Sequence, residues 1–113
     1  MAPQTKDKEK VDVLRCRGDL NASSMVSIKN KVSRLMHQNR KNVLLDLGKT
    51  QHVDLAGLGI LVERIKKIRS VDGDIKLCNV RPHVLQTFCL VGVSKLIESF
   101  ESEEEAIRSF HVA

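Results

Sequence analysis

The sequence predicts a single α/β domain. Short apolar segments typical of strands alternate along the chain with segments whose apolar residues recur at helical spacing. Strands that alternate with helices favour right-handed crossover connections. A chain of 113 residues suits one domain that folds without metals or disulfides. We expect a polar N-terminal tail over residues 1–10 and the folded domain over residues 11–113.

The first half is predicted to contain two strands and a helix. Residues 11–17 alternate apolar and polar side chains, as in a strand with one covered face. A helix is predicted near residues 24–38, preceded by Asn21 and two serines as candidate caps. The apolar run 43–47 is too short for a helix and suits a strand in the middle of a sheet.

The second half begins with the strongest helical pattern. Asp54 is placed to cap this helix, and from Leu58 one apolar stripe faces a charged side made of Glu63, Arg64, Lys66, Lys67 and Arg69. A strand over residues 74–80 follows, and Pro82 suits the first turn of the next helix, which Gly92 ends.

The last elements are short. We expect a strand over residues 96–100 and then a C-terminal helix. Ser102 and Glu105 form a capping-box pattern at the start of this helix, and its first turn holds three glutamates that favour the positive helix end.

Composition excludes several classes of protein. The three cysteines are widely spaced within apolar stretches, which predicts small buried side chains, and the histidines show no metal-ligand spacing. We therefore predict no metal site. The longest apolar run, residues 55–62, is far shorter than a membrane span. The polar N-terminus has no signal-peptide pattern, so the expected compartment is the cytoplasm.

The charge distribution does not favour nucleic acid as a partner. The net charge is +5, but five glutamates lie between residues 98 and 105, so the other 105 residues carry +10. The chain has no Trp or Tyr on which bases could stack, and no helix-turn-helix pattern. An acidic partner protein fits the positive excess equally well.

Few residues could carry catalysis, and we predict that the protein is not an enzyme. Gly57-Leu58-Gly59 is only half of a phosphate-binding loop and is better explained as a helix start that permits close packing. Asp46 and Asp54 are expected to act as a turn ligand and a helix cap rather than as an acid/base pair.

Four segments together resemble the STAS domain family, which includes the bacterial anti-sigma factor antagonists. They are Val-Leu-Leu-Asp-Leu at 43–47, Val-Asp-Leu-Ala-Gly-Leu-Gly-Ile-Leu at 53–61, the turn and strand at 72–80, and the helix and turn at 84–96. The resemblance covers residues 11–110. It implies a small mixed β-sheet with helices packed against it, no cofactor, and a protein-binding switch whose partner is an anti-sigma factor of the serine kinase type.

One residue departs from the family pattern. In the phosphorylated antagonists, the serine modified by the kinase directly follows the loop aspartate, and here that position holds Leu55. A phosphate would add about −1.5 to −2 charges beside Asp54 and weaken docking. Leucine has no hydroxyl, so we expect a surface that stays competent to bind. The alternative is that Leu55 packs inward.

The predicted docking surface combines this loop with the following helix: Asp54, Leu55, Ala56, Gly57, Arg64 and Lys67. We expect Leu55 to be an apolar anchor inside a basic rim on the exposed helix face. Thr50 and Ser94 are weaker candidates for phosphorylation and are more simply explained as turn or cap residues.

Two other functions remain open from the sequence. The family resemblance also allows a soluble STAS subunit of an ABC-type transporter, or a domain that senses a nucleotide or another small ligand. A helix start with Gly57 would suit a phosphate. The sequence also leaves open an extra strand before Val11.

Overall fold

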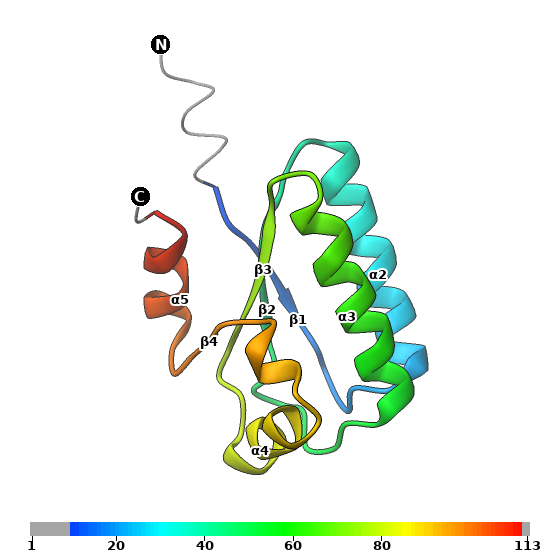
Figure 1. The fold of residues 1–113 in the computed structure, drawn as a ribbon. Coiled ribbons are helices and arrows are strands. Elements are labelled where there is room, and N and C mark those ends of the chain that lie inside the picture. The colour runs from blue at the N-terminus through cyan, green and yellow to red at the C-terminus, as the bar shows by residue number, and fades with distance from the viewer. Residues whose placement is uncertain (1–9, 112–113) are drawn as a thin grey trace.

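The computed structural model describes residues 10–111, in which strands and helices alternate along the chain (Figure 1). The first half contains β1 (Asp12–Arg15), α2 (Ala22–His37), β2 (Asn42–Asp46) and α3 (Leu55–Arg69). The second half contains β3 (Asp74–Cys78), α4 (Pro82–Leu90), the 3-10 helix η1 (Val93–Lys95), β4 (Ser99–Phe100) and α5 (Glu103–Phe110). The predicted α/β domain is confirmed.

The predicted elements are all present, and their ends differ by a few residues. α2 starts earlier than expected because Asn21 is its cap: the Ser24 amide donates to Asn21 Oδ1 at 3.0 Å, and the Asn21 amide donates to Ser24 Oγ at 3.0 Å. The strand predicted over residues 96–100 is limited to Ser99–Phe100.

The four strands form one sheet in the order β1-β2-β3-β4, and each neighbouring pair is parallel. The resemblance implied a mixed sheet, whereas all strand pairs within residues 10–111 run in the same direction. The question of an extra strand before Val11 falls largely on residues outside those described. Because the strands are parallel, their carboxyl ends meet at one edge, where α2, α3 and α4 begin (Figure 1).

Helices cover both faces of the sheet. α2 and α3 lie side by side on one face, and α5 lies on the other (Figure 1). In β2, Val43 and Leu45 belong to the large core beneath α2 and α3, whereas Leu44 belongs to a smaller core with Ala106 of α5. This two-sided burial explains why residues 43–47 are apolar without alternation.

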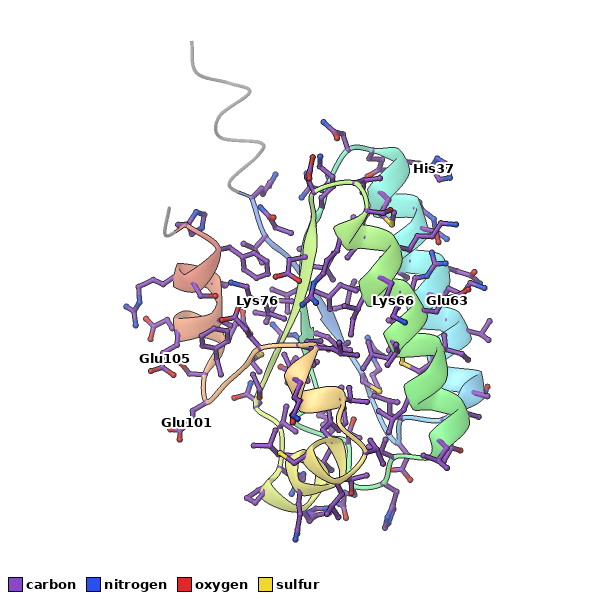
Figure 2. All side chains as sticks on the ribbon, in the orientation of Figure 1. His37, Glu63, Lys66, Lys76, Glu101 and Glu105 are labelled. Carbon is purple, nitrogen blue, oxygen red and sulfur yellow. The ribbon has the colours of Figure 1, made fainter. Side chains whose placement is uncertain are left out.

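A buried lysine attaches α5 to the sheet. Lys76 of β3 is only 7% exposed, and its Nζ donates to Ser109 Oγ at 2.9 Å. The same ammonium lies 4.5 Å from the ring centroid of Phe110 and 3.3 Å from Glu98 Oε1. Figure 2 shows Lys76 directed from the sheet toward α5. The charge is therefore buried together with partners that compensate for lost hydration.

A close helix contact fixes the position of α3. A Cβ at Gly57 would lie 2.8 Å from the Leu20 carbonyl oxygen and 2.9 Å from Asn21 Cα. Glycine is therefore required sterically where the first turn of α3 meets the start of α2, as predicted. Gly59 is exposed, and a Cβ there would meet nothing within 4 Å. No helix in the described part of the chain is long and apolar enough to cross a membrane.

Gly57→Ala and Gly59→Ala form a matched pair with opposite expected effects. Gly57→Ala should lower the free energy of unfolding by about 1–3 kcal/mol, because its methyl group meets backbone atoms. Gly59→Ala should raise it by up to about 1 kcal/mol, because alanine is the better helix former at an open position. Urea denaturation measures both. Equal effects of the two substitutions would contradict the proposed close contact.

The three cysteines differ in burial, although the sequence predicted that all of them are buried. Cys16 and Cys78 are buried, but Cys89 is exposed, so the expectation of three buried thiols is wrong for Cys89. Cys89 lies in the last turn of α4, directly after the buried core residue Phe88. Burial raises the pKa of the Cys78 thiol to about 11.

Thiol labelling at pH 8 should detect these environments. We expect one fast-reacting thiol in the native protein, Cys89, and all three after unfolding in urea, because reaction requires the thiolate. Cys89→Ser should remove the fast phase completely. Two or more fast thiols in the native protein would be inconsistent with the burial of Cys16 and Cys78.

Candidate functional site

The site is built around the first turn of α3, which Asp54 holds in place. Asp54 Oδ1 accepts a hydrogen bond from the Gly57 amide at 2.7 Å, confirming the predicted cap. The Asp54 amide donates to the Leu20 carbonyl at 3.0 Å, and Leu20 also pairs with Val53 in an isolated β-bridge. The loop before α3 is therefore anchored to the segment before α2 at the point where the helix begins.

Leu55 is the first residue of α3, and its exposed fraction is 73%. The alternative that this side chain packs inward is therefore wrong. Asp54 and Ala56 on either side are also exposed, and only Gly57 of the four loop residues is buried. The structure thus presents three neighbouring predicted residues to solvent and places the fourth beneath them, against α2.

The two basic residues predicted for the same surface lie elsewhere. Arg64 is only 6% exposed, and its Nη1 donates to Ser33 Oγ of α2 at 2.7 Å. The expectation that Arg64 lies on the exposed helix face is wrong, because this side chain crosses between the helices. Lys67 is exposed, but it follows Leu55 by 12 residues, or roughly 18 Å of helix. Along α3, no basic rim surrounds Leu55.

The structure also locates the two alternative phosphorylation candidates. Thr50 is fully buried, and its hydroxyl donates to the Gly18 carbonyl at 2.8 Å. A kinase would have to open the loop before it could reach this hydroxyl. Ser94 is partly exposed and lies within η1.

The exposed apolar end of α4 was not singled out from the sequence. Leu90 is 79% exposed and Val91 is 45% exposed. α4 starts close to the loop before α3, since His83 Nε2 and the Gln51 carbonyl oxygen lie 2.7 Å apart. The helical spacing predicts an apolar face made of Val84, Leu85, Phe88 and Cys89, and it does not mark Leu90 as a surface residue. Val84 and Phe88 are buried as expected.

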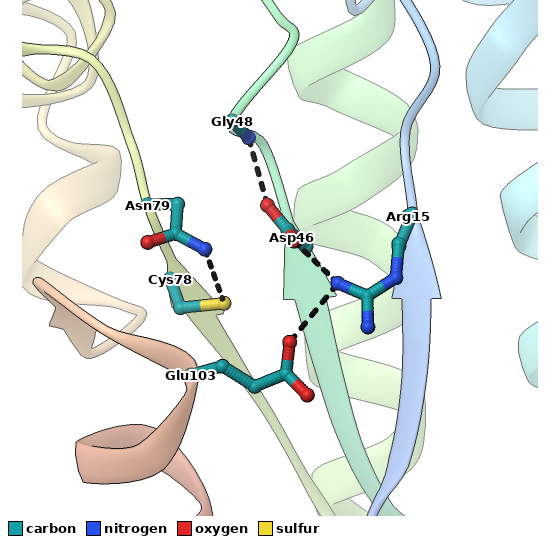
Figure 3. A network of polar contacts seen from close by, with 6 residues as sticks. All are labelled: Arg15, Asp46, Gly48, Cys78, Asn79 and Glu103. Carbon is teal, nitrogen blue, oxygen red and sulfur yellow. Dashed lines mark hydrogen bonds and ion pairs between the residues drawn. The ribbon is translucent and has the colours of Figure 1, made fainter.

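A charged network lies at the carboxyl edge of the sheet (Figure 3). Arg15 Nη1 donates to Glu103 Oε1 at 3.0 Å and to Asp46 Oδ2 at 2.6 Å, and these hydrogen bonds raise the pKa of Arg15. Asp46 Oδ1 accepts from the Gly48 amide at 2.8 Å, which confirms its predicted role as a turn ligand. The network links β1, β2 and the start of α5.

Beside this network is a cavity of about 430 Å³ whose lining includes Arg17 and Lys49. Its carboxylate, Asp46, is already paired with Arg15, and the nearby Cys78 thiol is held protonated by its raised pKa. Within residues 10–111, no group of three or more His, Cys, Asp and Glu side chains could hold a metal ion. The arrangement ties the carboxyl ends of β1 and β2 to the start of α5.

Comparisons with known proteins find relatives with a similar sequence and solved structures with a similar fold. BtrV of Bordetella bronchiseptica, named for the role of anti-sigma factor antagonist, is 27% identical over 110 residues, covering 96% of this chain and 95% of that protein. A Thermotoga maritima structure named for the same role has a TM-score of 0.82 at 20% identity and covers 90% of this chain and 88% of that one.

A transporter-associated protein has a similar fold. The structure of a sulfate transporter family protein from Wolinella succinogenes has a TM-score of 0.80 at 13% identity, covering 89% of this chain and 84% of that one. The fold alone therefore does not separate an anti-sigma factor antagonist from a domain of a transporter family protein. The model of the STAS domain matches residues 2–106, almost the whole chain. The protein belongs to the STAS domain family.

Proposed function

We propose that this protein is a cytoplasmic regulator of the anti-sigma factor antagonist type, which acts by binding a partner protein rather than by catalysis. The observation that carries the proposal is the 73% exposure of Leu55 at the first position of α3. The similarity to BtrV over nearly the full length of both chains supports this type of role. The proposed partner is an anti-sigma factor of the serine kinase type.

Leu55 has the properties of an anchor residue. Its backbone is fixed by the Asp54 cap and by the contact of Gly57 with the start of α2, so little further order is required when a partner docks. Burial of a leucine side chain contributes about 1.5–3 kcal/mol. A single rigid anchor of this size suits the small interfaces of transient signalling complexes.

The chemistry of residue 55 also determines how the surface is regulated. Leucine cannot be phosphorylated, and the Thr50 hydroxyl in the same loop is buried against Gly18. We therefore propose that binding is not switched by phosphorylation at the start of α3. The surface would remain competent, and control would come from the amount or the state of the partner.

The proposed surface contains fewer residues than the sequence predicted. It consists of Asp54, Leu55 and Ala56, with Gly57 supporting them from beneath. Arg64 and Lys67 are outside it, because one is buried and the other lies at the far end of α3. Without a basic rim on α3, the surface should recognise an apolar pocket on the partner more than an acidic patch.

Leu55→Glu should abolish capture of the partner without unfolding the domain. The substitution replaces an apolar anchor by a charge that docking would have to desolvate, so we expect affinity to fall by at least about 30-fold. Tagged wild-type and variant proteins, incubated with host lysate and read by mass spectrometry, measure the effect. A protein with a serine kinase-type ATP-binding domain should be recovered by wild type only.

Leu90→Glu is the matched control, because it makes the same change at an equally exposed leucine of α4. We expect it to recover the same partner as wild type. Undiminished capture by Leu55→Glu would refute the proposed anchor. Recovery of a transporter ATPase by wild type would instead support the transporter role, and a saturating nucleotide titration of the purified protein would support the sensing role.

A further inference from the structure

A second concave site lies at the other end of the helix pair, where α2 and α3 finish. It is a cavity of about 350 Å³ lined by Ser33, Met36, His37, Asn39, Lys41, Arg64, Lys67 and Val71. Figure 2 shows His37 at this end of α2, opposite the end where α3 begins. The cavity is therefore separate from the surface proposed around Leu55.

Arg64 is a buried cation in the wall of this cavity, and its hydrogen-bond and ion-pair partners compensate only part of its lost hydration. Its Nη1 donates to the neutral Ser33 hydroxyl, and its Nη2 lies 3.7 Å from Oε1 of Glu63, a side chain that is 61% exposed. The Arg64 Nε is buried and has no hydrogen-bond partner within the described residues. Burying a guanidinium with one loose ion pair is costly, and an adjacent anion would lower that cost.

The two lysines of the lining are positively charged, like Arg64. Lys41 comes from the loop before β2 and Lys67 from the last turns of α3, and none of the carboxylates within residues 10–111 lines the cavity. The carboxyl ends of α2 and α3 each carry about half a negative charge, which is smaller than the three positive charges of the two lysines and Arg64. The cavity is therefore positive overall.

Apolar groups complete the lining. Met36 contributes a flexible thioether side chain, and Val71, which is 42% exposed, lies just beyond the end of α3. A volume of about 350 Å³ is at the small end of the range for sites that bind small molecules. The lining thus combines cations with an apolar wall in a space too small for a folded protein.

We propose that this cavity binds a small amphiphilic anion, with a carboxylate or phosphate group held by Lys41, Lys67 and Arg64 and a short apolar body against Met36 and Val71. The charged group compensates the buried guanidinium, and the apolar body covers Val71. Arg64 positions the site by joining α3 to Ser33 of α2. Binding should therefore stiffen the contact between the two helices.

Three probes separate the charged group from the apolar body: octanoate carries both, octanol carries only the apolar body, and inorganic phosphate carries only the charge. Amide NMR titrations should show saturable octanoate shifts confined to residues 36–41 and 64–71. Octanol should bind at least about tenfold more weakly, because it lacks the charge. Inorganic phosphate should compete with octanoate if the same cations also hold phosphate groups, which distinguishes the two kinds of ligand.

Lys67→Gln and Lys66→Gln are matched variants, since both residues are exposed in the last turns of α3 but only Lys67 lines the cavity. We expect Lys67→Gln to weaken octanoate binding by about tenfold and Lys66→Gln to leave it within about twofold. Equal losses in both variants would show that octanoate responds only to the general positive charge of α3, and this result would overturn the proposal. Absence of saturable octanoate shifts at about 10 mM would also overturn it.

Discussion

The structure depends on the burial of β2 on both faces. Val43 and Leu45 require cover from α2 and α3, and Leu44 requires cover from α5, so helices must be packed against both sides of the sheet. Parallel pairing then places the start of α3 at the carboxyl edge, beside the start of α2. The loop before α3, with Asp54 and Leu55, occupies this position as a direct result of how the central strand is covered.

The two faces are covered by different means. α2 and α3 bury a large apolar core, whereas α5 covers a small apolar cluster and adds polar contacts through Lys76 and the Arg15 network. α5 is therefore the element whose attachment depends most on charge and on exposed ion pairs. Local opening of α5 should require less free energy than opening of α2 or α3.

The sequence predicted the order of elements because hydrophobic period and capping residues are local signals. Asp54, Asn21 and Pro82 all mark helix starts in the structure. It could not predict which charged residue of α3 is buried, because Arg64 falls between the apolar stripe and the solvent face and its environment depends on Ser33 of a different helix. Long side chains of this kind follow tertiary contacts that periodicity does not contain.

The candidate site was predictable to a similar degree. The loop motif located Asp54 and Leu55, but only the packing of Gly57 shows that Leu55 points outward, since the buried position of the turn is already occupied. The basic cavity combines residues from two helices and two loops that are distant in sequence, so no linear pattern marks it.

The exposure of Leu55 also has an evolutionary consequence. The cap is made by Asp54 and the close contact by Gly57, so the fold places little demand on the side chain between them. Substitutions at such surface positions usually change stability by less than about 0.5 kcal/mol. A lineage could therefore exchange a hydroxyl for an apolar group here through a single codon change that the rest of the protein would not have to accommodate. Under the proposed function, such a change would add or remove a regulatory input.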